Sequence, residues 1–341
     1  MRDIATSMSD VVVHPNASHR PVAHAQDTLL CDMDLPLSAT FYPLGFAVVI
    51  LTNRPEVMAA AEASFGHRSL QHGNAHLEIR IGVSESKSRQ TPPPPVRREY
   101  DHLYSMVADP ENQAVLDLRT GSNFVWLNES AVADPLYLRQ NFLEKVVYLL
   151  LGASVVTDIH AGCVSKLGKG ILLCGDSGAG KSTLSYACAR AGWTYTSDDT
   201  CYLLNDSAPP RVIGHSHRVR FRPEAKTLFP ELRDHEITAR MEGKPSIEVS
   251  VSDLPLLDTS NEANVCAVVY LRRSPSTRPA LIPLPYGSAT KMMSEELYSA
   301  GEIRAKHQKF LERLAVTATF ELHYHSLEEA ISQLDHLVAS L

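Results

Sequence analysis

The sequence predicts an α/β protein, and three features carry that prediction. An apolar stretch at 171–174 runs into a glycine-rich loop, and the loop runs into a segment of helical composition that stops at Gly192. A continuous apolar run at 263–271 suits a central strand covered on both faces. The segments 288–314 and 326–341 are typical of helices. Strands and helices are therefore expected to alternate along the C-terminal half.

The chain is expected to have three parts. Residues 1–34 are polar and rich in histidine, with neither helical nor strand periodicity, so we expect a flexible tail. Residues 35–145 are expected to form a small α+β domain, with a buried strand at 45–51 and a short antiparallel meander near 104–127. Residues 146–341 are expected to form the larger domain. This domain contains the glycine-rich loop and is expected to bind a nucleotide.

Composition excludes several classes of protein. The chain has 341 residues, 44% of them hydrophobic, a formal net charge of −7 and a pI near 6.1. This length permits a full core, and the acidic balance argues against a general nucleic-acid binder. Six scattered cysteines without a C-x-x-C pattern suit buried free thiols in a reducing compartment. With no signal-like N-terminus and no apolar run of membrane-spanning length, we expect a cytoplasmic protein without a membrane partner, for which an oligomer is possible.

The loop carries the pattern G-x-x-x-x-G-K-S, the Walker A motif of a P-loop. Its glycines let successive backbone N–H groups turn inward onto a phosphate. Lys181 then supplies a point charge for the β- and γ-phosphates, and the Ser182 hydroxyl is a ligand for Mg²⁺. We therefore predict a nucleoside triphosphate, ATP or GTP, bound together with Mg²⁺. The predicted nucleotide-binding residues are Gly175, Asp176, Ser177, Gly178, Ala179, Gly180, Lys181, Ser182 and Thr183.

Two acidic residues follow the next predicted strand, 193–197. Asp198 and Asp199 stand at its carboxyl end, the edge of an open α/β sheet where ligands bind. There one acid can hold Mg²⁺ while the other accepts a proton from an attacking hydroxyl. The alternative is an ordinary Asp-Asp turn. His160 precedes the hairpin that leads into the loop and can approach the same phosphates, although a lone histidine is more often structural.

Four segments together resemble the C-terminal kinase domain of bacterial HPr kinase/phosphorylase. In chain order they are His160-Ala-Gly-Cys163, Gly175-Asp-Ser-Gly-Ala-Gly-Lys-Ser182, Arg190-Ala-Gly192 and Ser197-Asp-Asp199. The resemblance covers about residues 145–205 well and the rest of the C-terminal half more loosely. It implies a P-loop kinase domain of the HPr-kinase/PEP-carboxykinase type, here preceded by a smaller mixed α+β N-terminal domain.

The resemblance also implies roles for individual residues. Lys181, Asp199 and His160 would be catalytic, with Asp199 as the general base toward the acceptor hydroxyl and His160 assisting it. Asp198 would be an acid on the metal side. Two departures matter: Thr183 stands where the family has glutamate, and the segment after Asp199 lacks the family's glycine-rich signature. The expected acceptor is therefore a serine of a protein or peptide other than HPr.

A later alternating segment offers more charged groups. Arg220, Arg222 and Glu224 can supply an arginine that faces phosphate and a further metal carboxylate, or they can form the exposed face of a strand. With Glu224 included, the predicted metal ligands are Ser182, Asp198 and Glu224.

These observations predict an ATP-dependent, serine-kinase-like phosphotransferase that uses Mg²⁺ and transfers the γ-phosphoryl group to a hydroxyl. Two alternatives remain open. One is a small-molecule kinase. The other is a nucleotide-binding regulatory module without phosphotransfer, against which the presence of both His160 and Asp199 argues.

Overall fold

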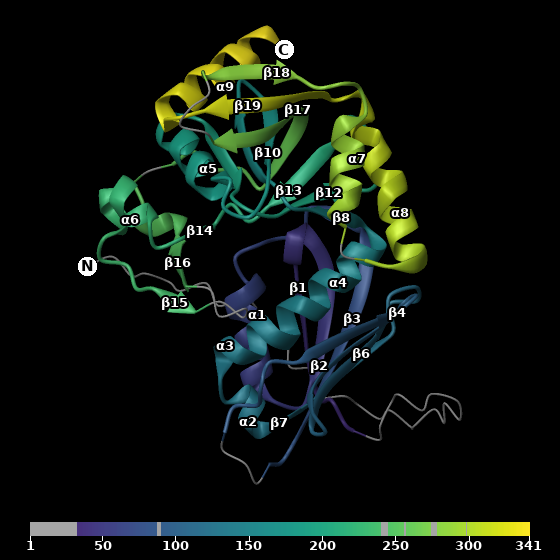
Figure 1. The fold of residues 1–341 in the computed structure, drawn as a ribbon. Helices are drawn as coiled ribbons and strands as arrows, with labels where there is room; N and C mark the ends of the chain where they lie inside the picture. Colours follow the sequence, from purple (N-terminus) through teal and green to yellow (C-terminus); the bar gives the residue numbers. More distant parts are fainter. Residues whose placement is uncertain (1–32, 87–89, 240–244, 256, 274–277, 298) are drawn as a thin grey trace, which may run out of the picture. The chain divides into compact units, whose positions relative to one another are not determined.

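The computed structural model describes residues 33–86, 90–239, 245–255, 257–273, 278–297 and 299–341 (Figure 1). All but the last two positions of the predicted N-terminal tail, 1–34, lie outside these residues. The chain divides into two compact units, Met1–Ser154 and Val155–Leu341, which are described separately below.

The first unit contains a seven-stranded mixed sheet. Its strands are β1 (Leu37–Phe41), β2 (Phe46–Thr52), β3 (His72–Ser84), β4 (Val96–Tyr100), β5 (Leu103–Asp109), β6 (Asn112–Asp117) and β7 (Asn123–Asn128). Its helices are α1 (Pro55–Phe65), α2 (Glu129–Val132), α3 (Pro135–Leu138) and α4 (Glu144–Ser154). The strand order is β1-β2-β3-β7-β6-β5-β4, with β3 parallel to both β2 and β7 and the other neighbours antiparallel.

Alternation of side chains explains the core of this first unit. In β2, Phe46, Val48 and Ile50 are buried and the residues between them are half-buried. Ile79 and Ile81 of β3 are also fully buried. The strands β5, β6 and β7 form consecutive antiparallel pairs, which confirms the predicted meander.

The second unit contains a nine-stranded sheet and a small three-stranded sheet. The strands of the large sheet are β8 (Val156–Ile159), β9 (Gly162–Lys166), β10 (Lys169–Cys174), β11 (Thr194–Ser197), β12 (Cys201–Leu204), β13 (Arg211–Gly214), β17 (Glu262–Arg273), β18 (Ala280–Pro283) and β19 (Ala318–Tyr324). The small sheet consists of β14 (Arg218–Phe221), β15 (Thr238–Ala239) and β16 (Pro245–Ser250). The helices are α5 (Lys181–Arg190), α6 (Ala225–Leu228), α7 (Ser288–Glu295), α8 (Gly301–Leu311) and α9 (Leu327–Ser340).

The large sheet is mixed. Its main order is β11-β9-β10-β17-β13-β12-β8, and β19 joins β17 with β18 beyond it. The strands β10, β17 and β19 run parallel, so their carboxyl ends meet at one edge. The remaining neighbours are antiparallel, including the hairpin β9–β10. The glycine-rich loop follows the carboxyl end of β10, at the edge where the three parallel strands end.

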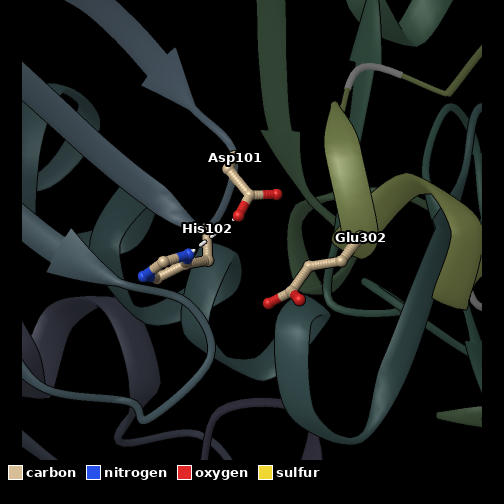
Figure 2. A group of neighbouring side chains, drawn as sticks. All are labelled: Asp101, His102 and Glu302. Carbon is tan, nitrogen blue, oxygen red and sulfur yellow. Dashed lines mark hydrogen bonds and ion pairs between the residues drawn. The ribbon is translucent and has the colours of Figure 1, made fainter.

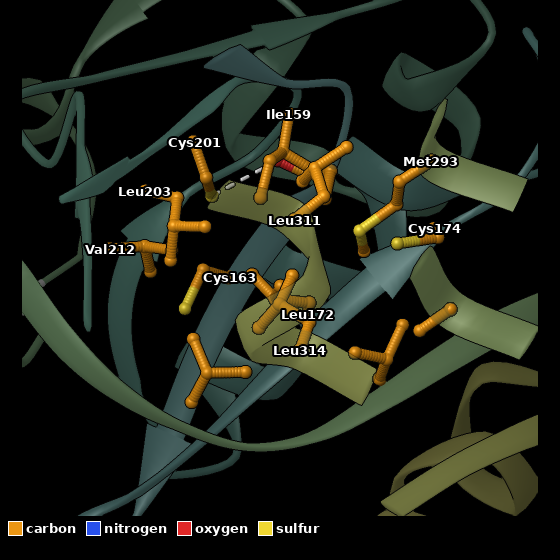
Figure 3. Close-up of a cluster of buried hydrophobic side chains, with 14 of the residues drawn as sticks. Ile159, Cys163, Leu172, Cys174, Cys201, Leu203, Val212, Met293, Leu311 and Leu314 are labelled. Atoms are coloured by element: carbon orange, nitrogen blue, oxygen red, sulfur yellow. Dashed lines mark hydrogen bonds between the residues drawn. The ribbon is translucent and has the colours of Figure 1, made fainter. Parts of the chain in front are cut away.

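Helices cover both faces of the central strands, as predicted for the run at 263–271. Leu184 of α5 and Leu334 of α9 pack with alternate residues of β10 and β17 on one face. Met293 of α7 and Leu311 of α8 pack on the other face (Figures 1 and 3). Because both faces are covered, every residue of β17 from 265 to 271 except Cys266 is buried.

Four cysteines, Cys163, Cys174, Cys188 and Cys201, are free thiols buried in this core, and three of them appear in Figure 3. Burial raises the pKa of Cys174, Cys188 and Cys201 well above the usual value of a thiol. These thiols are therefore packing groups, which confirms the expectation of buried free cysteines at these positions.

The segment 288–314, which the sequence predicts to be helical, is helical over most of its length but is not one continuous helix. Two helices, α7 and α8, are separated by a break, and a 3₁₀ turn over Glu312–Val316 follows. The guanidinium of Arg304 donates to the carbonyl oxygens of Ser294 at 2.7 Å and Leu297 at 2.6 Å. These bonds satisfy carbonyls that a helix end leaves without a partner. The break was not visible in the sequence because its stabilising partner lies in the next helix.

Within the described ranges, no helix is both long enough and apolar enough to cross a lipid bilayer.

Candidate functional site

The glycine-rich loop between β10 and α5 has a backbone that glycine adopts without strain. The φ angles of Gly175, Gly178 and Gly180 are 143°, 94° and 101°, all in the left-handed region. A Cβ on Gly175 would lie 2.9 Å from the Cβ of Ala179. A Cβ on Gly180 would lie 2.7 Å from the hydroxyl oxygen of Tyr324, which donates to the Ala179 carbonyl at 3.0 Å. Side chains at these positions would fill the loop, and β19 holds it in shape through Tyr324.

Lys181 lies at the centre of this loop and is only 5% exposed. Its Nζ donates to the carbonyl oxygen of Gly175 at 2.7 Å and lies 3.5 Å from that of Asp176. Burial lowers the pKa of Lys181, while the negative charges of Asp199 and Glu296 favour its ammonium form. Neutral carbonyls are weaker partners for an ammonium than phosphate oxygens are, so this cation is available to an anion in the loop.

Ser182 and Thr183 lie in the first turn of α5, and both are half-buried. The N–H groups of a first helical turn have no partner inside the helix and attract anions. The N-cap residue, Gly180, has no side chain that could occupy these groups. The start of α5 therefore offers backbone donors and the Ser182 hydroxyl beside the Lys181 ammonium.

Asp198 follows β11 and is 6% exposed. Its Oδ1 accepts a hydrogen bond from the Tyr195 hydroxyl at 3.2 Å, and its Oδ2 accepts one from the backbone N–H of Arg220 at 3.0 Å. Burial raises the pKa of Asp198 to about 6, and the charge of Asp199 adds to this rise. Both carboxylate oxygens are thus engaged within the protein.

The side chains of Asp199 and His160 lie close together. The Nε2 of His160 lies 3.8 Å from the Oδ1 of Asp199, and about one third of each side chain is exposed. His160 lies between β8 and β9, next to Gly162, where a Cβ would come within 2.4 Å of the Ser185 Oγ of α5 and 3.1 Å of the Asp198 carbonyl oxygen. This close approach places the histidine-bearing turn against the start of the acidic pair.

Glu224 lies elsewhere. It is an exposed residue at the start of the four-residue helix α6. In the described part of the chain, no contact joins its carboxylate to Ser182 or Asp198. The two nearby arginines differ: Arg220 Nε bonds to Glu248 at 2.5 Å, whereas Arg222 Nη2 donates to the Ser177 hydroxyl of the loop at 2.9 Å.

Glu296 is a site residue that the sequence reasoning missed. It is an exposed residue that caps the end of α7, and it lines a small cavity of about 50 Å³ together with His160, Thr200 and Met293. Burial raises the pKa of Glu296, and the nearby Lys181 ammonium opposes the rise. Only the break after α7 gives Glu296 this position, so no signal in the sequence distinguishes it from the preceding Glu295.

A larger open hollow of about 520 Å³ adjoins the other side of the loop. Its lining mixes charged and apolar residues and consists of Asp176, Gly178, Ala179, Leu271, Arg272, Arg273, Glu321 and His323. Arg272 Nη1 lies 3.6 Å from Asp176 and its Nε 3.2 Å from Glu321, which also bonds to His323 at 2.5 Å. The volume is in the range of small-ligand sites.

Figure 2 draws the side chains of Asp101, His102 and Glu302. In the first unit, His102 Nδ1 lies 3.1 Å from Asp101 Oδ2 at the turn between β4 and β5. Glu302 belongs to the second unit and lies in the first turn of α8, where an acidic side chain favours the helix. Each of these features is explained by its own surroundings.

The chain was compared with protein-family models, with curated proteins and with solved structures. No protein-family model matches the chain, and no curated protein matches it. Among solved structures, the Hpr(Ser) kinase/phosphatase from Coxiella burnetii matches 54% of this chain and 99% of its own, with 13% identity and a TM-score of 0.29.

The buried Asp198 predicts a dependence of stability on pH. Its pKa is raised from 3.8 to about 6, so the folded state disfavours its charged form. Its contribution to the free energy of unfolding is therefore greatest below about pH 4 and is lost as pH rises through about 6, by up to about 3 kcal/mol. Urea unfolding of the wild type and Asp198→Asn across this range measures the effect. The wild type should lose stability relative to the variant as pH rises, and a constant difference would contradict the assignment.

Proposed function

We propose that this protein is a Mg²⁺-dependent kinase that binds a nucleoside triphosphate and transfers its γ-phosphoryl group to a serine hydroxyl of a protein or peptide. The observation that carries the proposal is the gathering of Lys181, His160 and Asp199 around one glycine-rich loop. A cation for phosphate and a carboxylate with a neighbouring imidazole are the groups that phosphoryl transfer to a hydroxyl requires.

The loop fits a triphosphate. Its left-handed glycines leave a space that a Cβ would fill, and the start of α5 offers unpaired N–H groups. In this role Lys181 binds the β- and γ-phosphates and gives up its bond to the Gly175 carbonyl. The adjoining hollow of about 520 Å³ supports a nucleotide rather than a lone phosphate, because it leaves room for a nucleoside beside the loop.

The oxygen donors near Lys181 also fit Mg²⁺, which takes few protein ligands and completes its shell with phosphate and water. The Ser182 hydroxyl and a carboxylate would hold it, and the ion would neutralise charge on the phosphates. Asp198 already accepts two hydrogen bonds, which favours a positioning role for this residue over direct coordination. Glu224, at the start of α6, is the least supported of the predicted ligands.

The proposed reaction uses Asp199 as the general base. Its carboxylate accepts the proton of the acceptor hydroxyl, and the hydroxyl oxygen forms a bond to the γ-phosphorus. The bond between that phosphorus and the bridging oxygen breaks, and its electrons stay on the departing nucleoside diphosphate. His160, 3.8 Å from Asp199, orients the carboxylate and stabilises its charge.

Replacing the loop cation tests the binding half of the proposal. Lys181→Ala should weaken Mg·ATP and Mg·GTP binding by about 2 kcal/mol or more, because a charge-assisted contact is lost. Isothermal titration calorimetry measures this. Lys169→Ala is the matched control, since Lys169 stands at the other end of β10 and donates to the Val338 carbonyl. Equal affinity in wild type and Lys181→Ala would contradict a phosphate-binding loop.

Replacing the base tests the chemical half. Asp199→Asn should keep nucleotide affinity within a few-fold while phosphoryl transfer falls about 10²-fold or more, the usual contribution of a general base. Labelled phosphate and phosphoproteomics of host lysate, with each protein added, measure transfer and identify the acceptor. New phosphoserines that appear only with the wild type support the proposal. A phosphorylated metabolite as the sole product would make this a small-molecule kinase, and undiminished transfer by the variant would exclude Asp199 as the base.

A further inference from the structure

Arg222 reaches the glycine-rich loop from a separate part of the second unit. It directly follows β14, and its Nη2 donates to the Ser177 hydroxyl at 2.9 Å. A Cβ on Gly178 would lie 3.8 Å from the same nitrogen. The guanidinium is therefore next to the middle of the loop, although 45 residues separate Arg222 from Ser177 in the chain.

Arg222 differs from the two preceding arginines of this segment, Arg218 and Arg220, which form ion pairs with a glutamate. Arg218 and Arg220 share Glu248 of the paired strand β16, at 3.5 Å and 2.5 Å. Arg222 lies beyond the end of β14, and the described residues offer its guanidinium a hydroxyl but no carboxylate partner. A hydroxyl is a weak acceptor for a guanidinium compared with a phosphate oxygen, which allows two parallel charge-assisted hydrogen bonds.

Hydrogen bonds fix the direction from which Arg222 approaches. The Tyr195 hydroxyl oxygen lies 2.9 Å from the Arg218 carbonyl oxygen, and the Arg220 N–H donates to Asp198 at 3.0 Å. The strand β14 is thus held against the acidic end of β11, where Asp199 follows. Arg222 therefore comes to the loop from the side of the acids, and at Gly178 it meets a residue that also lines the large hollow with Arg272.

From this arrangement we infer that Arg222 binds the terminal phosphate of the triphosphate and stabilises its charge during transfer. The inference rests on the proposed function, since it assigns a further catalytic residue to the same site. The phosphate nearest the acids is the one that an acceptor attacks, and it carries charge on its three outer oxygens. Arg222 exchanges its hydrogen bond to Ser177 for hydrogen bonds to these oxygens. It takes no part in the covalent chemistry.

Affinities for di- and triphosphate separate this role from a general electrostatic one. Arg222→Gln should lower the affinity for Mg·ATP about 10-fold or more and leave the affinity for Mg·ADP within about 3-fold, because only ATP has the terminal phosphate. Arg222→Lys keeps the charge and should recover part of the loss. Arg211→Gln is the control, because Arg211 is an exposed arginine that pairs with Glu262 at 3.2 Å on β17. Titration calorimetry gives the affinities for Mg·ATP and Mg·ADP of the wild type and of each of the three variants.

Each outcome decides something. A loss confined to ATP supports the inference. Equal losses for ATP and ADP, or no loss for either, would overturn it while leaving the proposed function intact. A wild-type protein that binds neither nucleotide would overturn the proposed function and this inference with it. Since Arg222 is exposed, folding of the variants is expected, and a circular dichroism melt checks it.

Discussion

One buried carboxylate, that of Asp198, joins the parts of the second unit on which the candidate site depends. Its two oxygens accept hydrogen bonds from Tyr195 of the same strand and from the backbone of Arg220 in the small sheet. A buried acid without such donors would be strongly unfavourable, so these bonds fix the position of β14 relative to β11. Asp199 stands just after β11, and Arg222 stands just after β14. These are the two strands that Asp198 connects. Asp198 thus links the strand that precedes Asp199 to the strand that precedes Arg222.

Charge around Lys181 is the second organising feature. The ammonium is buried, which alone would favour its neutral form, and the acids Asp199 and Glu296 compensate. The three groups come from the start of α5, the end of β11 and the end of α7, so three separate elements must pack correctly before the charges balance. A triphosphate with Mg²⁺ would bring anionic and cationic groups together into the same space. In the structure the Lys181 ammonium is instead held by the carbonyl oxygens of the loop itself.

Local chemistry made much of this arrangement predictable. Glycines with left-handed φ, an apolar strand before them and a helix after them were evident in the sequence because each follows from the residues themselves. The strand at 263–271 was evident for the same reason. The family resemblance implied that His160 assists Asp199, and the two side chains lie 3.8 Å apart.

Features that depend on distant partners were not predictable. The break after α7 is stabilised by Arg304 of α8, and it places Glu296 at the site. Likewise, Arg220 and Arg222 are two residues apart in an alternating segment, so the pattern places both on the same face of a strand. The pattern therefore could not show that only Arg222 contacts the loop. The separation comes from where β14 ends and from Glu248 on its neighbour β16. In both cases the deciding partner is far away in the chain.

The central claim is that the loop and the His160–Asp199 pair form one phosphotransfer centre. A structure of the protein with Mg²⁺ and a non-hydrolysable ATP analogue tests it most directly. The account predicts that Lys181 Nζ leaves the Gly175 carbonyl for phosphate oxygens and that the terminal phosphate lies beside Asp199. A triphosphate bound away from the loop, or one bound in the loop with its terminal phosphate turned away from Asp199, would contradict the account.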